Sequence, residues 1–284
     1  MVKILRKRQL AETVYEFVLE APDIARKARA GQFVIIRTDE KGERIPLTIA
    51  DFDRDAGTLE IVFQVVGKTT DMLACCYGEG DSLLDLAGPL GKPSHIPTGE
   101  NIIVVGGGVG IAPVYPIAKA FHQAGNQVTG IVGARTEGLL ILEEKLAAVC
   151  DDFHIMTDDG TAGRCGLVTM PLTEILQARK DIDLVVAIGP GIMMKCCADA
   201  TRPFGVKTVV SLNSIMVDGT GMCGACRIEV GGETKFACAD GPEFDGHLVN
   251  FDQLGMRLRA YVDKEKIALD GYLKEKGEGC ACRR

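Results

Sequence analysis

A cysteine motif in the last third of the sequence carries the clearest chemistry. Cys223 and Cys226 form a C-x2-C pair on a glycine-rich stretch, and eleven residues separate this pair from Cys238. Glycines allow both thiolates of the pair to reach one metal centre, and Cys238 can come from a neighbouring strand or turn. Three thiolates with one further donor suit either tetrahedral zinc or a 2Fe-2S cluster. The motif therefore predicts a metal centre in this segment.

The fourth donor separates two interpretations of the motif. A plant-type cluster uses the spacing C-x4-C-x2-C…C, and Asp218 stands where the first cysteine of that spacing would be. We favour a 2Fe-2S cluster, and a zinc knuckle is the structural alternative. A metal-free group of buried cysteines is the third interpretation, and the many glycines argue against it.

A glycine-rich turn begins directly after an apolar run. Residues 101–108 (NIIVVGGG) have the pattern of a buried parallel strand. The turn contains Gly108-x-Gly110-x-x-Pro113, where backbone amides and the following helix can approach a dinucleotide pyrophosphate. It is not a G-x-G-x-x-G fingerprint, because Ile111 occupies the third glycine position. A purely structural tight turn remains the alternative.

Two further segments could contact phosphate. Arg44 stands beside Thr48 in RIPLTI, and an arginine next to a hydroxyl on an extended segment can hold a phosphate by charge-assisted hydrogen bonds. Residues 67–70 (GKTT) form a second phosphate-compatible turn. Each segment alone is equally consistent with a solvated charge or a loop.

The segments around these motifs predict three domains. Residues 1–98 contain short β-rich runs divided by Gly, Asp and Pro, which predicts a small antiparallel β-barrel; the runs are 13–21, 31–38, 58–67 and 81–88. We expect the segment with Arg44 to lie between two of these strands, and the only helical feature to be a turn near residues 70–77.

Residues 99–214 alternate apolar strand-like runs with helix-like stretches. This alternation predicts an α/β domain with a doubly wound parallel sheet of about five strands; the strand-like runs are 101–108, 127–134, 152–160, 184–191 and 206–213. From 215 to 284 the pattern stops. Residues 216–246 are rich in Gly, Cys and Asp, so we expect something other than apolar burial to hold them, followed by a helix within 252–273. Cys280 and Cys282 form a C-x-C in a tail that we do not expect to bind metal.

Composition excludes several classes of function. The 284-residue chain has 32 basic and 39 acidic residues, a net charge of −7, which argues against a general nucleic-acid partner. No apolar run has the length of a membrane helix, and the first residues lack a signal-peptide core. We expect a cytoplasmic protein that binds neither nucleic acid nor membrane.

The order of the motifs resembles the ferredoxin–NADP reductase superfamily, in which R-x-P-x-[ST] on a barrel precedes a G-x-G-x-x-P turn. The cysteine segment is similar to the branch that contains the electron-transfer subunit of dihydroorotate dehydrogenase. Within that branch, Asp218 in place of a cysteine resembles the small subunits of electron-bifurcating NADH-dependent reduced ferredoxin:NADP oxidoreductases, also described as sulfide dehydrogenase subunits. The resemblance covers nearly the whole chain.

The resemblance implies three cofactors and their sites. FAD would contact Arg44 at the pyrophosphate and Thr48 near the isoalloxazine, with further contacts from Pro46, Leu47, Gly67, Lys68, Thr69, Thr70 and Gly88. NAD(H) would be held by the residues that follow the parallel strands, namely Gly106, Gly108, Gly110, Pro113, Arg135, Glu137, Asp158, Asp159, Gly189 and Pro190. Asp218, Cys223, Cys226 and Cys238 would ligate the 2Fe-2S cluster. No residue is implied as a general acid or base.

The implied activity is hydride exchange between NAD(H) and FAD, followed by single-electron transfer through the cluster. Such a chain needs a larger flavin- and iron–sulfur-containing subunit, with which it forms a heterodimer. Through that subunit it would exchange electrons indirectly with ferredoxin and NADP(H). Glu137 lies where an acidic group often binds the ribose 2′-hydroxyl, which favours NADH, although Arg135 could accommodate a 2′-phosphate. The alternatives are a dihydroorotate dehydrogenase electron-transfer subunit, a zinc-stabilised nucleotide-binding module without catalysis, and a self-sufficient flavin reductase.

Overall fold

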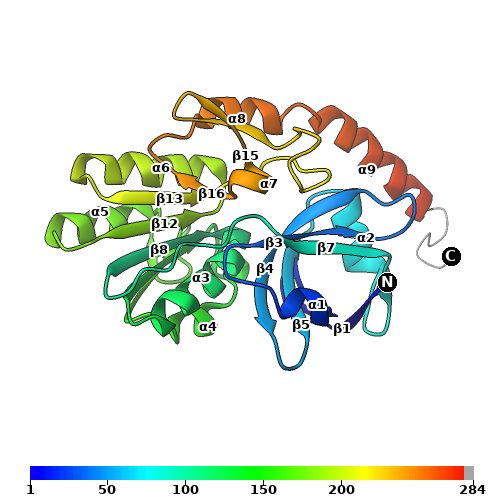
Figure 1. Cartoon of the computed structure of the whole chain (residues 1–284), viewed down its shortest axis with the longest axis horizontal. Coiled ribbons are helices and arrows are strands. Elements are labelled where there is room, and N and C mark those ends of the chain that lie inside the picture. The colour runs from blue at the N-terminus through cyan, green and yellow to red at the C-terminus, as the bar shows by residue number, and fades with distance from the viewer. Residues whose placement is uncertain (278–284) are drawn as a thin grey trace.

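The computed structural model describes residues 1–277, with two seven-stranded sheets side by side and a C-terminal segment across both (Figure 1). The tail that contains Cys280 and Cys282 lies outside the described residues. None of the helices in residues 1–277 has the length and apolar character needed to cross a membrane.

The N-terminal sheet is antiparallel and curls into a barrel, as predicted. Its strand order is β6–β1–β2–β5–β4–β3–β7, with β1 (Val2–Ala11), β2 (Val14–Glu20), β3 (Phe33–Arg37), β4 (Arg44–Asp53), β5 (Thr58–Gln64), β6 (Ser82–Leu83) and β7 (Asp85–Leu90). Alternate side chains such as Phe17, Ile36 and Ile61 fill the interior, because successive residues of a strand point to opposite faces.

Four details of the barrel differ from the sequence prediction. Arg44 lies within a ten-residue strand rather than between strands, and β1 is a further strand that the pattern did not reveal. Residues 68–76 form a longer helix, α2 (Lys68–Cys76), where the sequence indicated a single helical turn, and a short helix, α1 (Pro22–Ala25), follows β2. Pro46 within β4 concealed that strand, since proline is uncommon inside sheets.

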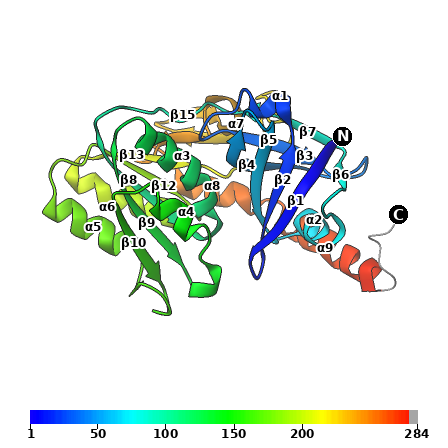
Figure 2. The same cartoon turned by 90° about the horizontal axis from the view of Figure 1, so that it is seen from below.

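The second sheet is parallel except at one edge, in the order β11–β10–β9–β8–β12–β13–β16. Its strands are β8 (Asn101–Gly107), β9 (Gln127–Ala134), β10 (Asp152–Thr157), β11 (Arg164–Cys165), β12 (Leu184–Ile188), β13 (Lys207–Ser211) and β16 (Glu243–Asp245). Helices α3 (Ile111–Gln123) and α4 (Glu143–Ala147) cover one face, and α5 (Thr169–Ala178) and α6 (Gly191–Thr201) cover the other (Figures 1 and 2). The doubly wound architecture matches the prediction.

The C-terminal segment is built into the second sheet instead of standing apart from it. It forms a hairpin of β14 (Arg227–Val230) and β15 (Glu233–Phe236), then α7 (Ala237–Asp240), the antiparallel strand β16, α8 (Phe251–Leu258) and α9 (Val262–Gly277). Ile228, Val230 and Leu254 are buried in the same core cluster as Val185 and Val210 of the parallel strands. The expectation that apolar burial would not hold this segment is therefore wrong.

Candidate functional site

The predicted dinucleotide residues meet at the carboxyl end of the parallel sheet. The strands β10, β9, β8 and β12 are neighbours, and each ends at one of the predicted motifs. The amide of Asp158 donates to the Ala134 carbonyl (3.1 Å), and the amide of Asp159 donates to the Arg135 carbonyl (3.3 Å). The structure thus joins the ends of β9 and β10 in the crevice where α/β sheets bind nucleotides.

The glycines of this crevice fall into two groups. A Cβ on Gly110 would lie 2.4 Å from the Ile188 carbonyl oxygen, and a Cβ on Gly107 would lie 2.2 Å from Met193 Sδ. Gly110 is required by packing, because its neighbours are backbone atoms, whereas the flexible Met193 side chain beside Gly107 could move aside. Gly108, with φ +55°, and Gly191 have no atom within 4 Å of a Cβ position, so their backbone is open to a ligand.

Met193 is a residue of the crevice that sequence reasoning missed. Its thioether covers Gly107 at the end of β8 and Gly189 at the end of β12. A flexible thioether fills irregular space well, and here it occupies the notch between the two strand ends. No pattern in the sequence distinguished Met193 from the other apolar residues of α6.

The rim of the crevice is acidic. Glu137 is exposed at the start of the short helix Glu137–Leu139, and its amide donates to Thr161 Oγ1 (2.8 Å). Burial, together with the charges of Glu137 and Glu144, raises the pKa of Glu143. The Arg135 side chain is also exposed, and its guanidinium makes no hydrogen bond or ion pair among the described residues. The rim therefore carries Arg135 together with the mutually repelling carboxylates of Glu137, Glu143 and Glu144.

Strand β4 presents a polar face outside the barrel core. Arg44, Pro46 and Thr48 alternate with Ile45 and Leu47, which pack against the barrel core. The Leu47 side chain therefore points away from the face that carries Arg44 and Thr48. The strand pairs with β3 through Thr48↔Phe33 and Arg44↔Arg37.

The predicted phosphate turn at residues 67–70 is the N-terminus of α2. Gly67 precedes the helix, and nothing lies within 4 Å of a Cβ position there. The Thr70 hydroxyl accepts from the amides of Val66 and Gly67, so it caps the helix, while the Thr69 hydroxyl donates to Glu43. Gly88 serves packing between strands, because a Cβ there would lie 2.7 Å from Val34 Cγ1.

A hairpin brings two of the four predicted metal ligands together. Cys226 precedes β14 and Cys238 follows β15, and their Sγ atoms lie 3.1 Å apart with both side chains buried. Burial and the neighbouring Cys226 thiol raise the pKa of Cys238 to about 12. A bound metal would instead lower the pKa of the Cys238 thiol, since coordination deprotonates a thiol. In residues 1–277, no three His, Cys, Asp or Glu side chains form a complete metal-binding group.

Asp218 and the exposed Cys223 stand on the loop beside this pair. The Asp218 carboxylate accepts from the amide and hydroxyl of Thr220 and from the amide of Cys223 (2.7 Å). These hydrogen bonds, led by the Thr220 amide, lower the pKa of Asp218 to about 2. The donor set of three thiols and one ionised carboxylate therefore fits an iron–sulfur cluster in its chemistry, and closing it requires Cys223 and Asp218 to turn toward the buried pair.

Packing seats the candidate cluster loop on the barrel. Gly219, with φ +80°, approaches so closely that a Cβ there would lie 2.7 Å from Leu90 Cδ1 and 3.0 Å from Ile35 Cγ1. Arg44 Nε donates to the carbonyl of Val217 (2.9 Å), the residue before Asp218. The polar face of β4 and the cluster loop are thus neighbours.

Two ion pairs fix the two sheets relative to each other. Lys119 of α3 lies 2.9 Å from Asp51 of β4, and Lys145 of α4 lies 3.2 Å from Glu60 of β5. Both ammonium groups also lie near the Tyr115 ring, at 5.7 and 5.6 Å from its centroid. Because α3 begins at the glycine turn and β4 begins at Arg44, these contacts set the spacing of the two predicted cofactor regions.

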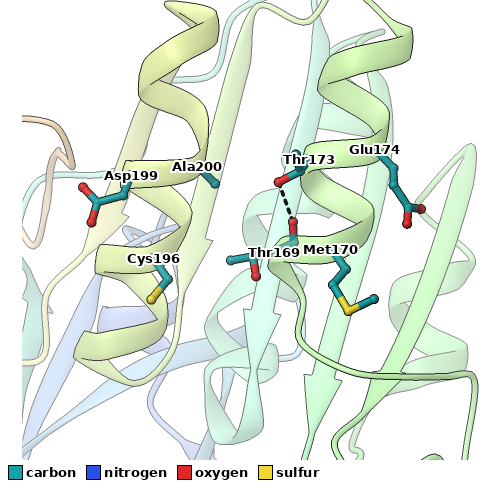
Figure 3. Close-up of a pocket in the computed structure, with 7 residues that line it drawn as sticks. All are labelled: Thr169, Met170, Thr173, Glu174, Cys196, Asp199 and Ala200. Carbon is teal, nitrogen blue, oxygen red and sulfur yellow. Dashed lines mark hydrogen bonds between the residues drawn. The ribbon is translucent and has the colours of Figure 1, made fainter.

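Two hollows lie apart from the residues predicted to bind cofactors. One of about 920 Å³ lies beside the Lys119–Asp51 pair and includes Arg54 and His95. The other, of about 570 Å³, lies between α5 and α6, where the Thr173 hydroxyl donates to the Thr169 carbonyl (Figure 3). Neither hollow contains a residue predicted to bind a cofactor, and we assign no function to them.

An antiparallel barrel, a nucleotide-binding type of α/β sheet and a cysteine-rich segment define an oxidoreductase of the ferredoxin-reductase-like class. Two family models match the chain: the iron–sulfur cluster binding domain of dihydroorotate dehydrogenase B over residues 213–250, and the oxidoreductase NAD-binding domain over residues 104–199. The chain belongs to the family of dihydroorotate dehydrogenase B electron-transfer subunits.

Relatives support this membership along nearly the whole chain. A homolog of the dihydroorotate dehydrogenase B (NAD(+)) electron-transfer subunit from Thermotoga maritima is 50% identical over 276 residues, which cover 97% of each chain. The electron-transfer subunit from Bacillus caldolyticus is 32% identical over 85% of this chain and 94% of its own.

Solved structures agree with the fold. A structure of an NADH-dependent reduced ferredoxin-NADP oxidoreductase, solved to study flavin-based electron bifurcation, is 48% identical, with a TM-score of 0.91 over 96% of this chain and 98% of that one. Phthalate dioxygenase reductase, at 16% identity and a TM-score of 0.60, covers 81% of this chain and 85% of its own, and it shares the fold alone.

Proposed function

We propose that this chain is the flavin- and iron–sulfur-containing electron-transfer subunit of an NADH-dependent reduced ferredoxin:NADP oxidoreductase. FAD and a 2Fe-2S cluster, when bound, would together convert the electron pair of one hydride from NADH into single-electron steps. The chain would work with a larger flavin- and iron–sulfur-containing subunit, and through it with ferredoxin and NADP(H). The small-subunit role agrees with family membership and with the 48% identical structure. We place the protein in the cytoplasm.

The seating of the candidate cluster loop on the barrel carries this proposal. Arg44 belongs to the strand that we assign to FAD, and it contacts the carbonyl next to Asp218. Gly219 fits against Ile35 and Leu90 of the same barrel. Electron transfer between a flavin and a cluster requires the two to be close, and this packing brings their proposed sites together.

We propose the following residue roles, which are compatible with the positions already described. Arg44, Pro46, Thr48 and the open Gly67 would bind FAD, while Gly108 and the end of β12 would hold the NAD(H) pyrophosphate. Asp218 and the three cysteines would ligate the cluster. We assign residues 1–98, 99–214 and 215–284 to the FAD, NAD(H) and cluster domains. The parallel sheet nevertheless receives β16 from the last of these.

A second candidate is the electron-transfer subunit of a dihydroorotate dehydrogenase. The 32% identical subunit and the cluster-domain model favour it. Both candidates share the cofactors and differ in the partner. An aspartate in the first ligand position of the spacing C-x4-C-x2-C…C favours the oxidoreductase that acts on ferredoxin.

One experiment separates these functions from the zinc-stabilised alternative. The chain is purified anaerobically, and its absorbance is recorded before and after addition of NADH. We expect flavin bands with a broad iron–sulfur shoulder, both bleached by NADH. A colourless protein that contains zinc would refute the proposal. If flavin and iron are present, the identity of the larger subunit that co-purifies with the chain distinguishes the oxidoreductase that acts on ferredoxin from a dihydroorotate dehydrogenase.

A further inference from the structure

Arg44 makes contacts in two directions. Its Nε donates to the Val217 carbonyl (2.9 Å) on the cluster loop, and its Nη1 lies 3.5 Å from the Asp85 carboxylate on β7. A guanidinium has five N–H donors in a fixed plane. After these contacts, donors remain on Arg44 for a phosphate on the polar face of β4.

Arginines hold the cluster loop at more than one carbonyl. Arg257 of α8 donates to the Ala225 carbonyl (3.0 Å), and Arg227 donates to the Gly224 carbonyl (3.0 Å). Both belong to the C-terminal segment itself. Arg44 differs from them because it reaches the loop from the barrel.

The loop next to Arg44 controls the position of Asp218. Val217 is joined directly to Asp218, whose carboxylate holds the amides of Thr220 and Cys223. Gly219 is fixed against the barrel by Ile35 and Leu90. A shift of the Val217 carbonyl would therefore move the carboxylate and Cys223 together.

We propose that Arg44 is a positioning residue that couples the flavin site to the cluster: one guanidinium binds the flavin diphosphate and fixes the loop that carries Asp218. This inference rests on the proposed function, and it adds that FAD occupancy changes the order of the cluster loop through Arg44. A phosphate bound to the remaining donors would hold the guanidinium in place, and thereby the Val217 carbonyl.

The test compares three conservative variants of the full chain. Arg44→Lys keeps the charge and loses the planar fork, which a lysine cannot replace at a site with several acceptors. Arg37→Lys is the matched control, because Arg37 faces Arg44 across β3 and β4 and, within residues 1–277, its side chain donates only to the hairpin carbonyls of Glu40 and Gly42. Arg257→Lys loosens the same loop from outside the barrel.

The first readout is the cluster in the holoprotein, after flavin and iron contents have been measured. We expect Arg44→Lys to release iron to a ferrous chelator about fivefold faster than the unchanged protein, a factor that corresponds to the loss of one hydrogen bond. We also expect a changed EPR signal of the reduced cluster. Arg37→Lys should match the unchanged protein. Equal release rates and EPR signals for Arg44→Lys and the unchanged protein would overturn the inference.

The second readout is hydrogen exchange of the amides in residues 216–223, with and without saturating FAD. FAD should slow exchange in the unchanged protein and in Arg257→Lys, and should have no effect in Arg44→Lys. An FAD effect that persists in Arg44→Lys contradicts the coupling. A protein that binds neither FAD nor iron refutes the proposed function instead, so the two failures are distinguishable.

Discussion

The Sγ atoms of Cys226 and Cys238 lie 3.1 Å apart, although a hairpin separates the two residues in the chain. Residues Gly231 and Gly232, both with positive φ, form its two-residue turn and pair Val230 with Glu233. The register then places Arg227 opposite Phe236, so the cysteines just outside these positions meet. The hairpin therefore brings two of the predicted cluster ligands together.

Replacement of Cys238 by serine should abolish cluster binding. A buried serine hydroxyl is a poor substitute for a thiolate ligand, so iron and sulfide contents should fall to background while bound flavin remains. Metal analysis and the visible spectrum measure both. Cys165→Ser is the control, because Cys165 is exposed on β11 and far from the motif in the sequence. Full iron content in Cys238→Ser would exclude Cys238 as a ligand.

Asp218→Cys should keep the cluster and change its electronic properties. Thiolate in place of carboxylate alters the ligand field, so the EPR signal and the midpoint potential of the cluster should both shift. The substitution also removes the acceptor of the Thr220 and Cys223 amides. Asp218→Asn separates the two effects, because it keeps an acceptor oxygen and removes the charge. An unchanged signal in both variants would show that Asp218 is not a ligand.

Glu137→Gln should weaken the preference for NADH. We predict that the acidic rim formed by Glu137, Glu143 and Glu144 repels a 2′-phosphate and that Glu137 accepts from a ribose 2′-hydroxyl. We expect the ratio of kcat/KM for NADH over NADPH to fall about tenfold, the value of one lost hydrogen bond to a charged group. Steady-state rates of flavin reduction give the ratio. Glu144→Gln, which changes the net charge by the same amount, should have a smaller effect on this ratio.

Asp51→Asn should loosen the contact between the two sheets. The Lys119–Asp51 pair is partly buried, with 34% and 18% of the two side chains exposed, so its loss should cost about 1 kcal/mol and lower Tm by about 3 °C. Thermal unfolding of Asp51→Asn, Lys119→Met and the double variant isolates the pair. Additive effects of the two changes would mean that the pair contributes nothing.

Glu243→Gln should remove a pH dependence of stability. Burial raises the pKa of Glu243 above 4.5, an effect only partly offset by the hydrogen bond from Ser94. The folded protein therefore binds this proton more tightly than the unfolded chain does. Its contribution to stability is present below pH 4.5 and is lost as the pH rises through the raised pKa.

The amide of Glu243→Gln cannot ionise, so the variant should have a higher Tm than the unchanged protein at pH 8, and the difference should shrink toward pH 5. Tm measured across this range gives the answer. Glu233→Gln is the control, because Glu233 is exposed on β15. A difference between Glu243→Gln and the unchanged protein that does not vary with pH would contradict the assignment.

The sequence alone determined the local elements and the chemistry that they carry. Alternation with period two defines the barrel strand at residues 58–64, and the apolar run at residues 101–107 defines a buried parallel strand, because side-chain periodicity depends on local geometry. The spacing of the cysteines likewise predicted a metal centre. Strand β4 was missed because Pro46 interrupts a pattern that the tertiary structure tolerates.

Only the tertiary structure decided which distant segments meet. It placed β16 on the edge of the parallel sheet, Gly219 against Ile35, and Arg44 beside Val217. It also showed that Gly110 serves packing while Gly108 is open. These contacts depend on how complete surfaces fit together across long stretches of chain, and residue type and spacing do not encode such a fit locally.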